Sequence, residues 1–323
     1  LAPGLRLMPV ADFRQRLLAS LGGQWPAPCA LQAQVHRVDA VDGYRIEHVS
    51  YQVEPEDVVP ALLLVADGAT DTQRAPGICV WHQHAGQWHL GKSEPAGLAG
   101  DSAHHTAVAL ARQGYVVLCP DALGFEDREK GYQHTGGDLE RLLFLRYLVR
   151  GRSLAWKNIL DMRRAVDYLA SRPEVDAEAL GCYGHSMGST HAWLVGPWEP
   201  RLRAIVGNCC LPSYAAIDDQ QLLHCFPNFI PGLYSYGDTP DVAGLIAPRA
   251  LHLNFGETDG GSPIQFVRQG VETIEAAYRA SGAQQNFTHY VEAGSGHVLS
   301  DSMWSRTREF FARHLGGARP ADA

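Results

Sequence analysis

Residues 181–193 read GCYGHSMGSTHAW and place Ser186 between two glycines at the end of an apolar run. The residues before this serine, ALGCYGH, have the composition of a buried strand, and those after it, STHAWLVG, are compatible with a helix. Gly184 and Gly188 suit a sharp and crowded turn between the two elements. The stretch therefore predicts a strand, a tight turn and a helix, with Ser186 exposed at the carboxyl edge of a sheet.

Short apolar runs alternate with helix-like segments on both sides of this turn. The runs lie at residues 77–81, 115–120, 202–210, 250–256 and 287–294, and the helical patterns lie at 106–114, 159–173, 264–282 and about 302–315. Such alternation is typical of βαβ units and a parallel sheet. Residues 44–53 and 58–67 precede it and predict antiparallel strands at one sheet edge. We therefore expect an α/β fold with a mostly parallel central sheet and helices on both faces.

The length of 323 residues fits one large α/β domain that carries an insertion. Residues 8–21 have the apolar spacing of an amphipathic helix, so we assign residues 1–34 to an N-terminal helical arm. The α/β core then covers residues 35–211 and 248–318. The stretch 212–247 is far longer than a usual connection, and we expect a helical cap inserted there after the sixth main strand.

Composition argues against several classes of partner. A net charge of −8 without a cluster of Lys and Arg excludes the electrostatic pattern of nucleic-acid binding. No apolar stretch approaches the length of a membrane span, and the first residues lack the pattern of a signal peptide, so we expect a soluble protein with no membrane partner. A small molecule is the expected partner, and the sequence leaves open whether the protein forms a homo-oligomer.

The seven cysteines indicate a reducing compartment. Five of them lie in or beside apolar runs that predict buried strands, where a free thiol behaves as a small hydrophobe; they are Cys79, Cys119, Cys182, Cys209 and Cys210. An odd number without regular spacing argues against a disulfide framework. We therefore expect a cytoplasmic protein.

A serine hydroxyl is a weak nucleophile and needs a histidine base and a carboxylate that orients the histidine. In this kind of fold both follow the serine, in the order serine, acid, histidine. Asp259 follows the predicted strand 250–256 in a loop rich in glycine, with Glu257 as the rival acid. His297 follows the last predicted strand in the motif GSGH. The predicted catalytic residues are Ser186, Asp259 and His297.

Acyl transfer also needs hydrogen-bond donors for a developing oxyanion. The backbone N–H of Met187, directly after the serine, is one expected donor because it begins a helix. The other is expected from the loop after residues 77–81, where His84 is our first choice and Ala85 the neighbouring candidate.

These motifs resemble the α/β-hydrolase superfamily and, within it, the serine hydrolases similar to dienelactone hydrolase and acetyl xylan esterase. The resemblance covers residues 60–315, and its most specific features are GHSMG, APRALHLNFGETDGGSP and GSGH. Two features depart from related patterns: Ser186 stands where dienelactone hydrolases carry cysteine, and His82-Gln83-His84-Ala85-Gly86 replaces the lipase motif HGGG. The resemblance also favours Asp259 over Glu257 as the acid.

The expected function is hydrolysis of a carboxylic ester through an acyl-enzyme, without a cofactor or metal. Alternatives on the same residues are hydrolysis of a thioester, an amide or a carbon–carbon bond, since fold does not set substrate. A remote alternative is a metal-dependent hydrolase that uses His82 and His84. Four aromatic residues are expected to contact substrate: Trp88, Phe125, Phe226 and Phe229.

Other polar residues near these motifs are expected to have structural roles. His185 and His191 would pack around the serine turn. Lys92 and Glu94 would form an ion pair that holds their loop. Asp127 and Arg128 are expected at the surface, as exposed charges usually are, with contact to substrate as the alternative.

Overall fold

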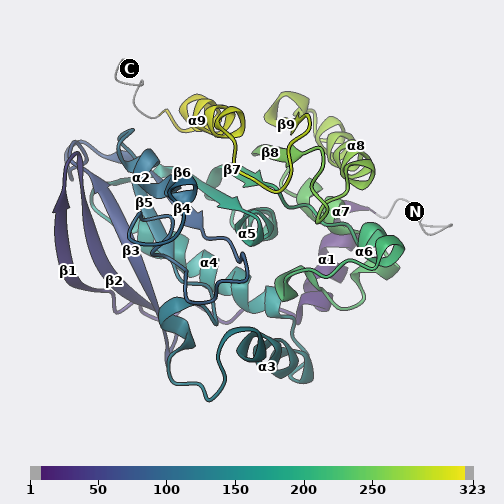
Figure 1. Cartoon of the computed structure of the whole chain (residues 1–323), viewed down its shortest axis with the longest axis horizontal. Coiled ribbons are helices and arrows are strands. Elements are labelled where there is room, and N and C mark those ends of the chain that lie inside the picture. The colour runs from purple at the N-terminus through teal and green to yellow at the C-terminus, as the bar shows by residue number, and fades with distance from the viewer. Residues whose placement is uncertain (1–8, 317–323) are drawn as a thin grey trace.

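A computed structural model describes residues 9–316 and contains a nine-stranded mixed sheet (Figure 1). The strands are β1 Gln34–Val41, β2 Tyr44–Glu54, β3 Asp57–Ala66, β4 Ala75–Trp81, β5 Val116–Pro120, β6 Val175–His185, β7 Leu202–Asn208, β8 Ala250–Gly256 and β9 Phe287–Glu292. Their order in the sheet is β1-β2-β3-β5-β4-β6-β7-β8-β9. The first three strands pair antiparallel, as does β3 with β5, and the others pair parallel. This arrangement confirms the predicted mostly parallel sheet with an antiparallel edge.

Helices cover both faces of the sheet. The helices are α1 Val10–Leu21, α2 Thr106–Ala111, α3 Gly136–Val149, α4 Leu154–Ala170, α5 Met187–Val195, α6 Tyr214–Gln220, α7 Thr239–Gly244, α8 Ile264–Ala280 and α9 Asp301–Leu315. The core on one face includes side chains of α2 and α9. The larger core on the other face includes side chains of α1, α4, α5, α7 and α8. The two cores hold the parallel strands rigidly, so their carboxyl ends form a fixed platform.

Single turns of 3₁₀ helix lie in the connections. They are η1 Ser102–His104, η2 Glu126–Glu129, η3 Gly196–Trp198, η4 Phe226–Asn228, η5 Leu233–Ser235 and η6 Gln284–Asn286. Two of them, η4 and η5, belong to the stretch 212–247, together with α6 and α7. This stretch, called the insertion below, is thus built of short helical pieces.

Two elements were not predicted from the sequence. The first, β1, is an edge strand whose residues are mainly exposed, including Val35 and Val38, so it lacks the buried alternation that marks a strand. The second, α3, has apolar residues around most of its circumference rather than along one stripe. Because β1 precedes the other strands, the insertion follows the seventh strand in the chain and not the sixth.

The helix α1 is packed onto the insertion. Phe13 packs edge to face against Tyr236 at 5.7 Å, and the Tyr236 hydroxyl lies 2.8 Å from Ser20 Oγ. Arg14 donates to the carbonyl of Pro197 at 2.6 Å. The division into arm, core and insertion stays our own interpretation. Residues 1–8 of the arm and residues 317–318 of the core lie outside the described residues.

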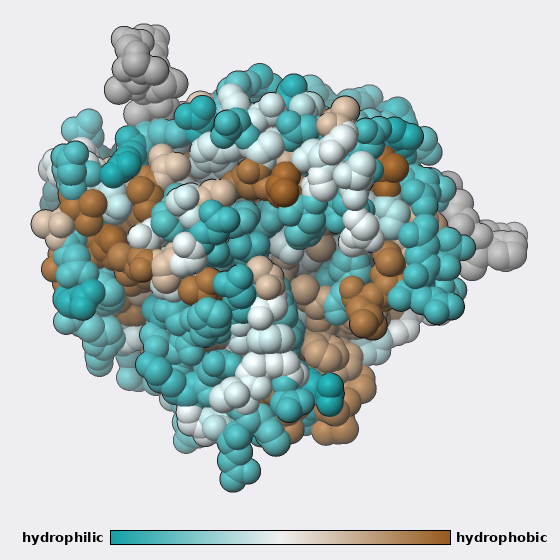
Figure 2. All heavy atoms as spheres, in the orientation of Figure 1, coloured by the Kyte–Doolittle hydropathy of each residue, from teal (hydrophilic) through white to brown (hydrophobic). Residues whose placement is uncertain are grey.

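The surface and the thiols agree with a compact α/β protein. The face drawn in Figure 2 is mainly hydrophilic, and its hydrophobic residues form separate patches. All seven cysteines are free, and the five that the sequence placed in apolar runs are buried. Between residues 9 and 316, no helix is long and apolar enough to cross a membrane.

Candidate active site

Ser186 lies at the turn between β6 and α5, in a strained backbone conformation with φ 57° and ψ −118°. The turn is crowded: a Cβ added to Gly184 would lie 2.0 Å from the Gly188 carbonyl oxygen. A Cβ added to Gly188 would lie 2.0 Å from the carbonyl oxygen of Trp81, at the end of β4. Only glycine fits at either position, and the backbone N–H of Ser186 is held by the Asn208 carbonyl at 2.8 Å. The predicted strand, turn and helix are all present.

The three predicted catalytic residues are joined by hydrogen bonds. Ser186 Oγ lies 2.8 Å from Nε2 of His297, and Nδ1 of the same ring lies 2.7 Å from Oδ2 of Asp259. Because an ionised carboxylate only accepts, Nδ1 carries the hydrogen and Nε2 is left as the acceptor for the serine hydroxyl. The His297 side chain is 41% exposed, so the ring that contacts Ser186 remains open to the outside.

Asp259 is suited to hold the histidine in this orientation. Its side chain is almost completely buried, and its second oxygen, Oδ1, accepts the N–H of Gly261 at 2.9 Å. Burial raises the pKa of the Asp259 carboxyl, but the hydrogen bond and charge of His297 outweigh it, and the net pKa is below the ordinary value. Asp259 is therefore ionised at neutral pH.

Glu257, the rival acid, is directed elsewhere. Its Oε2 accepts the N–H of Gly294 at 2.9 Å, and within the described residues Glu257 forms no hydrogen bond with His297. The side chain thus fastens the loop after β9 to the loop after β8. The geometry selects Asp259 from the two carboxylates that the sequence offered.

The expected oxyanion donors lie on two adjoining elements. Met187 is the first residue of α5, and its N–H has no hydrogen-bond partner within residues 9–316. Free amides at a helix N-terminus favour negative charge. The close contact of Gly188 with Trp81 brings this helix end against the end of β4, and the loop that carries His84 begins there.

The His84 ring is turned toward α3. Its Nδ1 accepts the N–H of Gly86 at 2.9 Å, and its Nε2 lies 2.9 Å from Oε2 of Glu140. The ring is therefore neutral, with its hydrogen on Nε2. This anchoring leaves the backbone of His84, rather than its side chain, as the candidate oxyanion donor, as the sequence suggested.

The four aromatic residues proposed to contact substrate differ in their surroundings. Trp88 is partly exposed and donates its Nε1–H to Glu140 at 3.0 Å. Phe125 is only 2% exposed and packs edge to face against the His84 ring, so it belongs to the packing beneath the loop that carries His84. Phe226 packs against Phe144 of α3 at 4.8 Å. Phe229 stacks on Tyr214 and on the core.

The histidines considered for a metal site are engaged in other contacts. His82 Nδ1 lies 2.8 Å from the Gln83 carbonyl, and its Nε2 accepts the N–H of Ala122. With both nitrogens of His82 and of His84 occupied, neither ring offers a free lone pair. These hydrogen bonds argue against a metal site formed by His82 and His84.

A group of three carboxylates, Asp121, Glu126 and Asp127, could hold a cation, but the Lys92 ammonium lies there. Its Nζ is 2.8, 2.7 and 2.6 Å from the three side chains. The expected ion pair of Lys92 with Glu94 is thus wrong. Glu94 instead accepts from Gln83 at 2.9 Å.

Arg128 is not at the surface, contrary to expectation. It is 6% exposed and pairs with Asp57 at 3.0 Å and Asp161 at 2.7 Å. A buried guanidinium is tolerated only when it is paired in this way. The network anchors the loop after β5 to the neighbouring elements, which is a structural role.

Two more histidines form a row of tilted rings with His297. The His185 ring lies 5.2 Å from His297, and the His104 ring lies 4.6 Å from His185, centroid to centroid. Burial lowers the pKa of His185 well below its ordinary value, so the ring is neutral. His185 and His191 are both buried, which confirms their predicted packing role.

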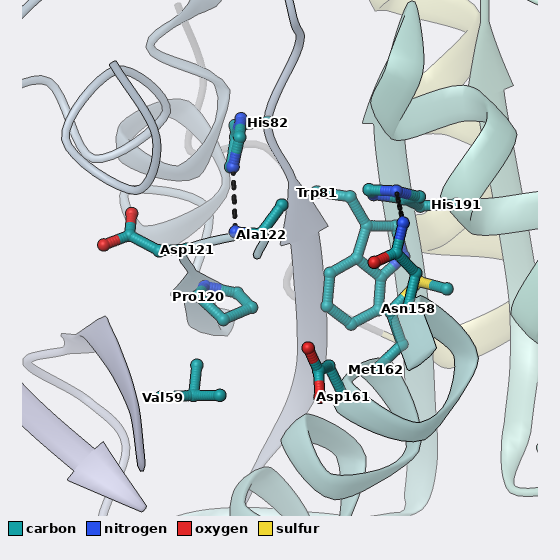
Figure 3. A pocket seen from close by; sticks show the side chains of 10 residues that line it. All are labelled: Val59, Trp81, His82, Pro120, Asp121, Ala122, Asn158, Asp161, Met162 and His191. Carbon is teal, nitrogen blue, oxygen red and sulfur yellow. Dashed lines mark hydrogen bonds between the residues drawn. The ribbon is translucent and has the colours of Figure 1, made fainter. Parts of the chain in front are cut away.

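A small cavity of about 20 Å³ beside His191 is lined by residues of β3, β4, α4 and α5 and of the loop after β5 (Figure 3). Trp81, His82, Asn158 and Asp161 face it. The volume suits a single water molecule, which needs at least about 10–15 Å³. This cavity is therefore too small to be a substrate pocket.

Two residues at the site were missed by sequence reasoning. His224 belongs to the insertion, and its Nε2 lies 2.5 Å from the carbonyl oxygen of Gly261, a residue in the loop of Asp259. Glu140, in α3, connects His84 with Trp88. Neither residue belongs to a motif, and their contacts span 37 and about 50 residues of chain, so no local pattern identifies them.

Comparison with known proteins agrees with this arrangement. Residues 69–222, which include His84, Ser186 and Met187, match the model of the dienelactone hydrolase family. This stretch is a dienelactone hydrolase family domain. Over 290 residues, which cover 88% of this chain and 93% of the other, the chain is 28% identical to a Bacillus subtilis protein named as a hydrolase, YtaP.

Solved structures extend the likeness beyond the dienelactone hydrolase family domain. An acetyl xylan esterase from Paenibacillus sp. R4 superposes with a TM-score of 0.62 at 17% identity, over 97% of each chain. A glucuronoyl esterase from Solibacter usitatus superposes with a TM-score of 0.67 at 15% identity, over 94% of this chain and 91% of the other. Identities this low establish the fold alone, and the fold is that of an α/β-hydrolase, as the sequence predicted.

Proposed function

We propose that this protein hydrolyses carboxylic esters through an acyl-enzyme formed on Ser186. The observation that carries the proposal is the unbroken line of hydrogen bonds from Ser186 through His297 to Asp259 at a strained turn. The dienelactone hydrolase family domain, the protein named as a hydrolase and the esterases of similar fold support an ester-hydrolysing enzyme.

In this mechanism His297 takes the proton of Ser186 as the serine oxygen attacks the ester carbonyl. The N–H groups of Met187 and His84 then stabilise the oxyanion, each donor contributing roughly 10²–10³ in rate. His297 returns the proton to the leaving alcohol, and afterwards activates the water that cleaves the acyl-enzyme. Asp259 stays ionised throughout and stabilises the imidazolium.

Ser186→Ala with a fluorophosphonate probe tests this function. The wild type is expected to be labelled covalently at Ser186 and to lose activity, while the variant is neither labelled nor active and keeps its thermal midpoint. Activity of the wild type toward simple aryl esters should persist in a chelator. Turnover in the variant near the wild-type rate would refute the role of Ser186.

The bond that is cleaved is the second part of the proposal. Thioester, amide and carbon–carbon hydrolysis use the same groups, so a panel of substrates matched in acyl group compares them. We expect the oxygen ester to have a higher kcat/KM than the amide, because the amide carbonyl is less electrophilic and an amine is a poorer leaving group even when His297 protonates it. A higher value for the thioester or the amide would reassign the activity within the same site.

A further inference from the structure

Glu140 is a buried carboxylate whose charge is not balanced by a cation. Its side chain is only 6% exposed, and within residues 9–316 no Lys or Arg forms an ion pair with it. Its Oε2 lies 2.9 Å from Nε2 of His84. That ring is neutral because its Nδ1 accepts the Gly86 N–H, so it supplies no positive charge. An isolated buried charge is costly, which is why buried carboxylates are normally paired.

The two oxygens of Glu140 are used unequally. Oε2 accepts both neutral donors, from His84 at 2.9 Å and from Trp88 at 3.0 Å. Oε1 has no hydrogen-bond partner among the residues that the structure describes, although a carboxylate oxygen can accept two bonds. The carboxylate is thus held firmly through one oxygen, and the other is available to a ligand.

The surroundings of Glu140 are those of the candidate active site. It lies one side chain away from the backbone of His84, the proposed oxyanion donor. The helix that carries Glu140, α3, contacts η4 of the insertion, where Phe144 packs against Phe226. Glu140 therefore lies beside the oxyanion loop, on the helix that contacts η4.

Aromatic rings surround this position. Trp88 packs edge to face on His84 at 5.1 Å, and Gly136 and Gly137 at the start of α3 leave room for its indole ring. One turn along α3 from Glu140, Phe144 packs on Phe226. A carboxylate beside aromatic faces is a combination that binds ammonium groups, because charge and ring quadrupole act together.

We propose that Glu140 is a specificity-determining residue that binds a positively charged amine of the substrate, so that the preferred esters carry an ammonium or alkylammonium group close to the scissile carbonyl. This inference rests on the proposed ester hydrolysis at Ser186. The net charge of −8 adds long-range attraction for such substrates. The amine can belong to the alcohol or to the acyl part, and the experiment separates the two.

The test compares charged esters with uncharged esters of the same shape. For the alcohol side, choline acetate is paired with neohexyl acetate, in which carbon replaces the nitrogen. For the acyl side, the ethyl ester of an ω-amino acid is paired with the alkanoate in which methyl replaces the ammonium. In the wild type, kcat/KM should favour the charged member of one pair at least about tenfold, as expected for a charge-assisted contact.

Glu140→Gln isolates the contribution of charge. The amide oxygen can still accept from His84 and Trp88, so the shape of the loop is kept while the negative charge is lost. We expect the ratio of the two kcat/KM values to fall to near one. The matched control is Asp138→Asn, which removes one negative charge from an exposed position of the same helix and should leave the ratio as in the wild type.

Several outcomes would overturn the inference. The first is a wild type without preference for the charged member of either pair, which needs no variant and holds even if Glu140→Gln unfolds. The second is a preference that survives in Glu140→Gln. The third is equal preference for a hydroxyl in place of the ammonium, which would show hydrogen bonding without charge recognition. If the wild type cleaves no ester at all and Ser186 is not labelled, the proposed function fails first and the inference falls with it.

Discussion

His224 of the insertion donates its Nε2–H to the carbonyl oxygen of Gly261, 2.5 Å away. Burial lowers the pKa of His224, so its ring is neutral at physiological pH and can carry hydrogen on this nitrogen alone. The next link is the Gly261 N–H, which is donated to Oδ1 of Asp259. The insertion is thereby tied to the acid that orients His297.

This link predicts that His224→Ala slows catalysis more than it weakens substrate binding. Without the contact, the loop of Gly261 is free to shift, and small displacements of positioned groups are costly. We expect kcat to fall about tenfold with a smaller change in KM. The exposed His134 provides the control: His134→Ala should change neither constant, and a pure KM effect in His224→Ala would contradict the link.

Asp259→Asn should lower kcat by roughly 10⁴, because an amide favours the wrong histidine tautomer and leaves the imidazolium unbalanced. Glu257→Gln is the matched variant, since its side chain accepts the Gly294 N–H and forms no hydrogen bond with Ser186 or His297 within residues 9–316. It should keep kcat near the wild-type value. Ester hydrolysis under saturating substrate measures both, and a reversed order would make Glu257 the acid.

Phe226 and Phe229 should respond differently to truncation, although both lie in the insertion. Phe226 contacts α3 near the proposed substrate path, so Phe226→Ala should change the ranking of esters by chain length, each lost contact being worth ~1–3 kcal/mol. Phe229 packs on Tyr214 and the core, so Phe229→Ala should lower the free energy of unfolding by about 2–4 kcal/mol and leave the ranking intact. Urea unfolding and a series of acyl esters distinguish them.

Buried neutral histidines should make the fold sensitive to acid, and His191 isolates the effect. Burial lowers the pKa of His191 from 6.5 to about 3. The unfolded chain therefore binds a proton that the folded chain does not, and stability falls as the pH drops from about 6.5 toward 3. The contribution lost is about 2 kcal/mol by pH 5, relative to neutral pH.

His191→Gln removes this titration while keeping a polar group beside Asn158, which contacts His191 Nε2 at 3.1 Å. The free energy of unfolding should then decline less between pH 7.5 and pH 5 in the variant than in the wild type, by about 2 kcal/mol. Parallel slopes in the two proteins would mean that His191 is protonated in the folded state or does not titrate in this range.

The sequence by itself determined the local elements of the site. The turn around Ser186 followed from two glycines between an apolar run and a helix, and the positions of Asp259 and His297 followed from the loops after the last two strands. These signals are local because strand and helix periodicity involve residues only a few positions apart. The same locality explains why β1 was missed, since an exposed edge strand has no buried side to mark it.

The tertiary structure alone decided which side chains meet. It selected Asp259 rather than Glu257, gave Lys92 three carboxylates that follow it by 29 to 35 residues, and placed Glu140 against His84 across 56 residues of chain. Ser186 and His297 are themselves 111 residues apart. Such contacts depend on how the strands and helices pack, because packing sets the direction of each side chain and excludes water around it. A short stretch of sequence determines neither the direction of a side chain nor its exposure to water.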